Sequence, residues 1–120
     1  MSEGSCHVVS IKVLGKEPGD VGRILAMLAE TLSNLKPEIL TRGNSWLIAS
    51  FKEGLVTAQV EAYTTPPGST LRVECIVRVS GRPDLIARLA ESLNASASRL
   101  GYPVLLELDH DRVKSPPGFL

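Results

Sequence analysis

The chain has 120 residues, and its 13 Lys and Arg residues balance 13 Asp and Glu residues, so the formal net charge is zero. This length suits one compact domain. With 43% hydrophobic and 22% charged residues, the composition is that of an ordinary globular protein and excludes disorder as the main state. The lack of a basic excess argues against a nucleic acid held through its phosphates, so we expect no nucleic-acid partner.

The N-terminal residues and the cysteines bear on the compartment. Residues 1–6 are polar, with no basic region before an apolar run, so we expect no signal peptide. No apolar stretch approaches the roughly 20 residues that cross a bilayer. Cys6 and Cys75 are too few for a disulfide framework. The sequence therefore predicts a cytoplasmic protein with no membrane partner.

The first third of the chain has a strand pattern followed by a helix pattern. Residues 7–14 alternate with a period of two, which predicts a strand. Residues 15–20 form a Gly- and Pro-containing turn, and Asp20 is suited to cap the next helix. Pro37 is expected to end that helix. Its apolar stripe contains Val21, Ile24, Leu25, Leu28, Leu32 and Leu35.

The middle of the chain is rich in β-prone residues. Residues 38–41 indicate a short strand, residues 42–44 a turn and residues 46–51 an apolar strand. Residues 56–63 alternate and favour a strand, although their apolar positions also fit one face of a helix. After the turn at 64–70, the clearest strand pattern in the chain has on its inner side Leu71, Val73, Cys75, Val77 and Val79.

The last third predicts a helix, a strand and a tail. Pro83 suits the first turn and Gly101 the C-terminal cap of a helix over residues 81–100. The following strand is expected to bury Val104, Leu106 and Leu108. We expect residues 1–111 to form one domain and residues 112–120 a C-terminal tail. The apolar stripe of the second helix contains Leu85, Ile86, Leu89, Leu93, Ala97 and Leu100.

This order of elements predicts an α+β fold. Each helix has one apolar stripe and most strands have one apolar face, which indicates two layers. The predicted architecture is a ferredoxin-like sandwich: an antiparallel sheet with both helices on one face. An extra β-hairpin around residues 45–63 would be an insertion into this pattern.

In the strands predicted at residues 7–14, 71–79 and 104–108, successive side chains alternate between the two faces of the sheet. This alternation predicts which residues lie on the open face, the face that the helices leave uncovered. These residues are aliphatic or carry charges of both signs, and none is aromatic, which disfavours stacking on the bases of single-stranded RNA. We expect this face to pair with a second copy in a dimer or higher homo-oligomer, with Lys12 and the arginines meeting Glu74 and Glu107 across the axis. A solvated sheet is the alternative. The residues are Val8, Ser10, Lys12, Leu14, Arg72, Glu74, Ile76, Arg78, Leu105 and Glu107.

The turn between the first strand and the first helix is a candidate ligand site. A glycine-rich turn that leads into a helix presents free backbone amides and the positive end of the helix dipole, which favour an anion or a carboxylate. Alternatively, the glycines serve only a tight turn and close helix packing.

At this turn the chain resembles the ACT domain family of small regulatory modules. The resemblance rests on residues 18–30 (PGDVGRILAMLAE), which are close to the Pro-Gly opening of the first helix in that family. It implies a ferredoxin-like fold, self-association, and a small ligand such as an amino acid bound near the turn. The positions that it implicates are Lys16, Glu17, Pro18, Gly19, Asp20 and Val21, and Arg23, which ends the same segment, is a further candidate ligand residue.

Acylphosphatases offer a second resemblance, because they have a similar sandwich and hold a phosphate in the same loop. Their glycines and arginine are spaced like Gly15, Gly19 and Arg23. Their chemistry also needs an Asn on a neighbouring strand to position water, whereas this chain has Ala49 and Ser50 there. An acylphosphatase-like enzyme is thus the less favoured reading, and no other nucleophile set has a recognisable context.

The ends of the first and last strands could bring together groups that bind metal. An antiparallel pairing of these strands would place His7 near Asp109 and His110, which are candidate ligands for zinc or another divalent ion. We expect them to be solvated strand ends and predict no metal and no cofactor. Cys75, on the inner side of its strand, is expected to be inert packing.

Together these patterns favour a non-enzymatic module that binds a small molecule or has a regulatory role, and that self-associates. The alternative is a structural subunit of a larger complex, docked through its sheet edge or its tail.

Overall fold

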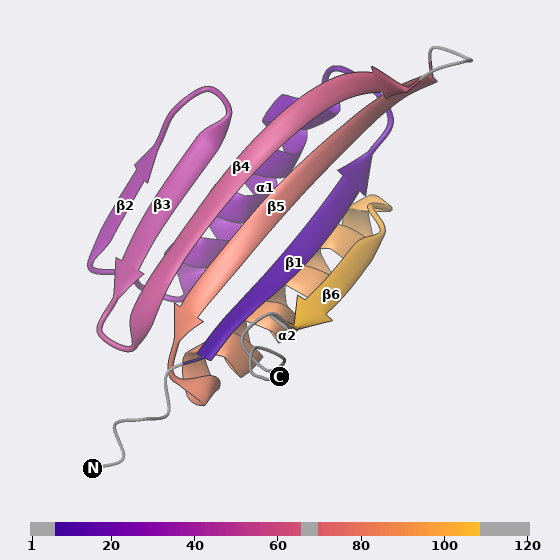
Figure 1. Cartoon of the computed structure of the whole chain (residues 1–120). Coiled ribbons are helices and arrows are strands. Elements are labelled where there is room, and N and C mark those ends of the chain that lie inside the picture. Colours follow the sequence, from indigo (N-terminus) through magenta and orange to yellow (C-terminus); the bar gives the residue numbers. More distant parts are fainter. Residues whose placement is uncertain (1–6, 66–69, 109–120) are drawn as a thin grey trace, which may run out of the picture.

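The computed structural model of this chain describes residues 7–65 and 70–108. One sheet forms the front layer, and both helices lie behind it (Figure 1). The expected tail, together with Cys6, Asp109 and His110, lies outside the described residues. In chain order the elements are β1 (His7–Gly15), α1 (Asp20–Asn34), β2 (Ile39–Arg42), β3 (Trp46–Phe51), β4 (Gly54–Thr65), β5 (Thr70–Gly81), α2 (Pro83–Leu100) and β6 (Val104–Leu108).

The six strands form one antiparallel sheet in the order β2-β3-β4-β5-β1-β6. This α+β arrangement is compatible with a ferredoxin-like sandwich. The expected insertion at residues 45–63 is misplaced, because β4 lies beside β5 within the body of the sheet. The added hairpin is instead β2 and β3, which extend the sheet beyond β4.

The ambiguous segment around residues 56–63 is a strand. Val56, Ala58 and Val60 are buried on the helix side, while Thr57, Gln59 and Glu61 lie on the other face. Twelve residues of β4 pair with twelve of β5, and this long hairpin supplies the backbone partners that a helix would otherwise provide.

The core lies between the helices and the inner face of the sheet. The predicted stripes are confirmed at Ile24, Leu25, Leu28 and Leu32 of α1, all fully buried, but not at Leu100, which is 56% exposed at the end of α2. The expectation for β6 is also wrong in part. Leu106 is paired with Ile11 on the helix side but is 59% exposed, because β6 is an edge strand that α2 covers only partly.

Both helices end as the sequence indicates, but the start of α1 differs. Pro83 opens α2, and Gly101 ends it with a left-handed φ of 84°. α1 stops at Asn34, before Pro37, and Lys36 takes a positive φ of 61°. The N-cap of α1 is Gly19, so Asp20 is the first helical residue and not the cap. No helix within residues 7–65 and 70–108 has the length and apolar character needed to span a membrane.

Candidate functional sites

The turn between β1 and α1 is organised around the carboxylate of Asp20. Its Oδ2 accepts hydrogen bonds from the backbone N–H groups of Lys16 (2.8 Å) and Glu17 (3.0 Å). Its Oδ1 accepts one from Nη1 of Arg23 (2.8 Å) and one from the hydroxyl of Tyr102 (2.9 Å). The backbone amides of Glu17 and Lys16 lower the pKa of Asp20 well below its ordinary value, with smaller contributions from Tyr102 and Arg23, although burial opposes the shift.

Gly15 allows this arrangement. A Cβ atom on Gly15 would lie 2.8 Å from Cβ of Asp20 and 2.9 Å from its Oδ2, closer than packed carbon and oxygen atoms approach. The sequence therefore needs glycine here so that the Asp20 side chain can fold back over the turn.

The structure brings together some of the residues that the sequence predicts to bind a ligand, but they surround the carboxylate of Asp20. Lys16, Glu17 and Arg23 all bind Asp20. Three further amides of the helix start donate to backbone carbonyls: Asp20 N–H to that of Glu17, Val21 N–H to that of Pro18 and Arg23 N–H to that of Gly19. The internal carboxylate thus occupies the place that the sequence assigns to an anion.

This geometry bears on the resemblance to acylphosphatases, which hold a phosphate in the corresponding loop. The guanidinium of Arg23 is paired with Asp20 and, at 3.4 Å, with Glu17, and its pKa is raised first by the hydrogen bond to Asp20. A bound phosphate would have to displace Asp20 and would meet its negative charge. The arrangement therefore does not favour an acylphosphatase-like site.

The open face of the sheet is a second candidate site, and its residues form rows across the strands. One row joins Trp46, Gln59, Ile76, Lys12 and Leu105, each paired with the next on the neighbouring strand. The next row joins Thr41, Ile48, Thr57, Arg78, Ser10 and Glu107. The ten residues that parity assigns to this face all lie on it, and none of them is buried.

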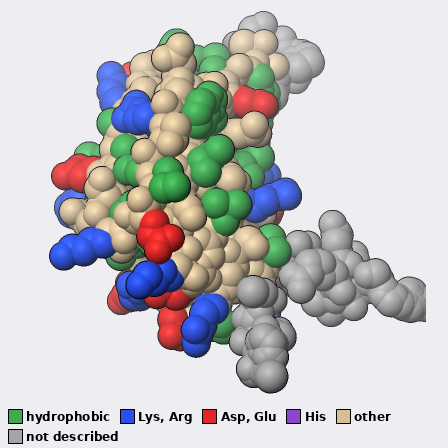
Figure 2. Space-filling model, turned by 90° about the vertical axis from the view of Figure 1, so that its left-hand side faces the viewer, with side chains coloured by type: hydrophobic (Ala, Val, Ile, Leu, Met, Phe, Trp, Pro, Cys, Tyr) green, Lys and Arg blue, Asp and Glu red, His purple; other side chains and the backbone are tan. Residues whose placement is uncertain are grey.

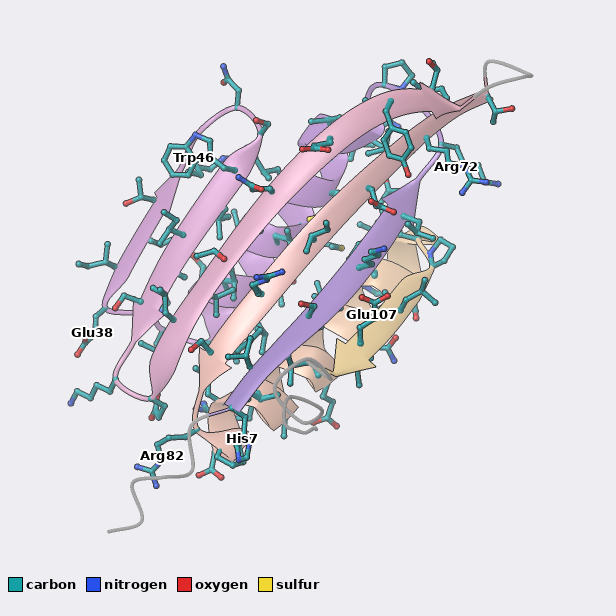
Figure 3. The ribbon with its side chains drawn as sticks, in the orientation of Figure 1. His7, Glu38, Trp46, Arg72, Arg82 and Glu107 are labelled. Atoms are coloured by element: carbon teal, nitrogen blue, oxygen red, sulfur yellow. The ribbon has the colours of Figure 1, made fainter. Side chains whose placement is uncertain are left out.

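The expectation that this face has no aromatic residue is wrong. Trp46 of β3 and Tyr63 of β4 both lie on it, 39% and 38% exposed. Trp46 projects from the sheet in Figure 3, and its indole ring lies against Gly43. The argument against base stacking therefore no longer holds, and only the balanced charge argues against nucleic acid.

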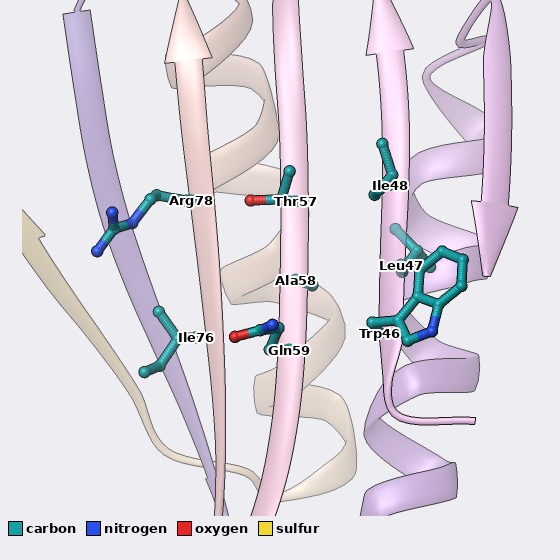
Figure 4. Close-up of a pocket in the computed structure, with 8 residues that line it drawn as sticks. All are labelled: Trp46, Leu47, Ile48, Thr57, Ala58, Gln59, Ile76 and Arg78. Carbon is teal, nitrogen blue, oxygen red and sulfur yellow. The ribbon is translucent and has the colours of Figure 1, made fainter. Parts of the chain in front are cut away.

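A shallow hollow of about 520 Å³, here called the sheet hollow, occupies the open face. Trp46 and Ile48 stand on one side of it and Ile76 and Arg78 on the other, with Thr57 and Gln59 between them (Figure 4). Hydrophobic side chains are also exposed among charged ones around the β2 edge (Figure 2). The large hydrophobic residues exposed on the open face are Ile39, Trp46, Ile48, Leu55, Tyr63, Ile76 and Leu105.

The charges of the open face are partly paired within the chain. Nζ of Lys12 lies 3.6 Å from Oε2 of Glu74 and 4.0 Å from Oε2 of Glu107, so Lys12 joins β5 and β6 within one copy. Among the residues that the structure describes, Arg78 and Glu61 have no ion-pair partner.

A second hollow of about 510 Å³ lies between the two helices. Arg23, Glu30 and Arg99 line it, together with Met27 and Leu100. At its floor the hydroxyl of Thr31 donates a hydrogen bond to Oγ of Ser96 at 3.0 Å, which joins the helices. Arg23 is thus shared between this hollow and the turn.

The remaining sequence candidates lie apart from these sites. His7 is exposed at the start of β1, and its predicted partners Asp109 and His110 are outside the described residues (Figure 3). Residues 7–65 and 70–108 contain no group of three His, Cys, Asp or Glu side chains that could hold a metal. Cys75 is fully buried, and burial raises the pKa of its thiol to about 12, as expected for inert packing.

Comparison with known proteins gives the fold and no family. No protein-family model and no curated protein matches the sequence. A crystal structure of an unknown protein from Galdieria sulphuraria superposes with a TM-score of 0.51 at 13% identity. The match covers 90% of this chain and 52% of that one, so this chain spans about half of its length. At this identity the similarity shows a shared fold alone.

Proposed function

We propose that this chain is a non-enzymatic module that self-associates through the open face of its sheet, with a ferredoxin-like fold and a regulatory role similar to that of ACT domains. The observation that carries the proposal is the row Trp46, Ile76 and Leu105, which exposes an indole and two aliphatic side chains on the face opposite the helices. Covering such side chains removes apolar surface from water, which is favourable by about 25 cal/mol per Å².

The size of the face is suited to a dimer. Six strands about 4.8 Å apart give a width of about 24 Å, and the rows from Leu55 to Tyr63 extend over roughly 27 Å, so the face covers on the order of 600 Å². Stable interfaces bury about 800 Å² of accessible surface per partner. The accessible surface of this face is larger than its planar area, because side chains protrude from the sheet. A second copy could therefore cover the whole face.

The turn at residues 15–23 has a structural role in this proposal. Its amides bind Asp20, so the turn holds the start of α1 against β1 and the segment after α2. A small ligand, such as an amino acid, would then bind where the open faces of two copies meet and not in the turn itself.

Sedimentation equilibrium over a wide concentration range tests the proposal. We expect a reversible dimer, and we expect Ile76→Lys to weaken it strongly, because the substitution places a charge in the centre of the covered face. Leu100→Lys is the matched control: Leu100 is also an exposed aliphatic residue but lies on α2, behind the sheet. A chain that stays monomeric at all concentrations would overturn self-association and favour a subunit that docks on a different protein.

A further inference from the structure

We infer that the second copy packs against the open face about a two-fold axis that crosses β5 at Ile76, and that Arg78 of each copy pairs with Glu74 of the other. This inference rests on the proposed function and specifies how the two copies meet. It follows from the order of residues along the exposed sides of β5 and β4.

The exposed side of β5 is self-complementary about its midpoint. Ile76 lies at the centre, and Glu74 and Arg78 lie at equal distances on either side of it. An axis in the plane between two sheets, perpendicular to the strands at Ile76, places Ile76 on Ile76 and Glu74 on Arg78 of the second copy. Each ion pair then occurs twice, as two-fold symmetry requires.

The same axis suits the neighbouring strand. Ile76 pairs with Gln59 of β4, so the axis crosses β4 at Gln59. It then sets Thr57 opposite Glu61 of the second copy, and Leu55 opposite Tyr63. A hydroxyl therefore faces a carboxylate, and an aliphatic side chain faces an aromatic one. No pair of like charges is created on β4 or β5.

The axis also crosses β3 at Trp46 and β1 at Lys12. Two indole rings then face each other across the axis, at the rim of the sheet hollow that Trp46 lines. The two Lys12 side chains approach each other, and the Glu74 and Glu107 carboxylates of their own chains compensate this charge. Packed sheets lie about 10 Å apart, a separation that Arg and Glu side chains can bridge from opposite sides.

Arg78 gains an ion-pair partner in this arrangement. It lies on the rim of the sheet hollow and has no ion pair among the residues that the structure describes (Figure 4). An alternative axis along β1 would pair Arg78 with Glu107 of the second copy. That axis would leave β3 uncovered, with Trp46 and Ile48 still in water, so the observations favour the axis through Ile76.

A charge-swap experiment tests the pairing. The dimer dissociation constants of the full-length wild type, Arg78→Glu, Glu74→Arg and the double variant Arg78→Glu/Glu74→Arg are measured by sedimentation equilibrium. We expect each single variant to weaken the dimer about tenfold or more, because like charges then face each other twice, and the double variant to recover most of the loss. Arg78→Glu/Glu107→Arg is the control and should not recover it.

Each outcome decides between the two claims. A wild type that is monomeric overturns the proposed function and this inference with it. A wild-type dimer that is indifferent to Arg78→Glu, or that is rescued by Glu107→Arg and not by Glu74→Arg, overturns the axis through Ile76 and leaves self-association intact. Circular dichroism of each variant verifies that the fold is retained, and Arg78→Gln, which should weaken the dimer less than Arg78→Glu, gives a second test if a charge reversal unfolds the chain.

Discussion

The hydroxyl of Tyr102 donates a hydrogen bond to Oδ1 of Asp20 across 2.9 Å and so ties the segment after α2 to the first residue of α1, 82 positions earlier in the chain. Tyr102 is held in place by its own backbone N–H, which donates to the carbonyl of Ala97 at 2.9 Å. Burial, and then the hydrogen bond to Asp20, raise the pKa of the phenol, so the hydroxyl remains a donor. The bond therefore joins the start of α1 to the segment after α2, at one end of the helix layer.

Removing this hydroxyl should cost a measurable part of the stability. We expect Tyr102→Phe to lower the free energy of unfolding by about 1.5–3 kcal/mol, the usual net value of a hydrogen bond to a charged group. Urea denaturation provides the measurement. Tyr63→Phe is the control, because the Tyr63 hydroxyl lies 3.5 Å from Oε2 of Glu74 on the exposed face. We expect its removal to change the free energy of unfolding by less than about 0.5 kcal/mol. Equal losses in the two variants would contradict a structural role for the Tyr102 bond.

The ionisation of Asp20 predicts a dependence of stability on pH. The pKa of Asp20 is lower in the folded chain than its ordinary value of 3.8, so the ionised carboxylate stabilises the fold above about pH 4. This contribution is lost as the pH falls from there toward the folded-state pKa. We expect Asp20→Asn to be less stable than wild type by about 2 kcal/mol at neutral pH, since hydrogen bonds to a charged group are lost.

The difference between wild type and Asp20→Asn should therefore shrink as the pH is lowered below about 4. Urea denaturation curves of both proteins between about pH 7 and pH 3 give this difference directly. If it stayed constant over the whole range, the ionised form of Asp20 would not be the form that the turn stabilises.

Two glycines near the turn should respond in opposite directions to the same substitution. Gly15→Ala brings a Cβ atom against Asp20 and should destabilise the fold by about 1–3 kcal/mol. Gly22, within α1, has no atom within 4 Å of a Cβ position, and alanine there should stabilise the helix by about 0.5–1 kcal/mol. Thermal unfolding of both variants checks the pair, and a tolerated Gly15→Ala would show that Asp20 need not lie over the turn.

Much of the fold could be predicted from the sequence, because period-two alternation is strong where one face is buried. In β5 the small and aliphatic inner residues contrast with Arg72, Glu74 and Arg78 outside, so the face of every residue follows. In β3 this contrast is missing. Trp46 and Ile48 are as apolar as the buried Leu47 and Ala49, and the sequence could not assign them to the open face. Trp46 and Ile48, on one side of the sheet hollow, were missed for this reason, whereas Ile76 and Arg78 on its other side were predicted to lie on the open face.

The turn binds a carboxylate, as its sequence indicates, but that carboxylate belongs to the chain itself and not to a ligand. The segment from Lys16 to Arg23 has the amides and the cation that bind a carboxylate, and the sequence indicates as much. The carboxylate is Asp20 itself, and the contact that fixes its orientation comes from Tyr102, far along the chain. The spacing of residues within the turn cannot predict a contact with a residue so far along the chain. Leu106 was misjudged because alternation gives the face of a residue but not how far a helix extends over it.

Trp46 allows the most direct test of the central claim that the open face is covered by a second copy. It is the single tryptophan of the chain, and it lies on this face at 39% exposure. Its fluorescence emission should shift to longer wavelength on dilution, with the same midpoint as dissociation in sedimentation, while Ile76→Lys should show the long-wavelength spectrum at every concentration. An emission maximum that stays constant while the dimer dissociates would show that the copies meet elsewhere and would contradict the account.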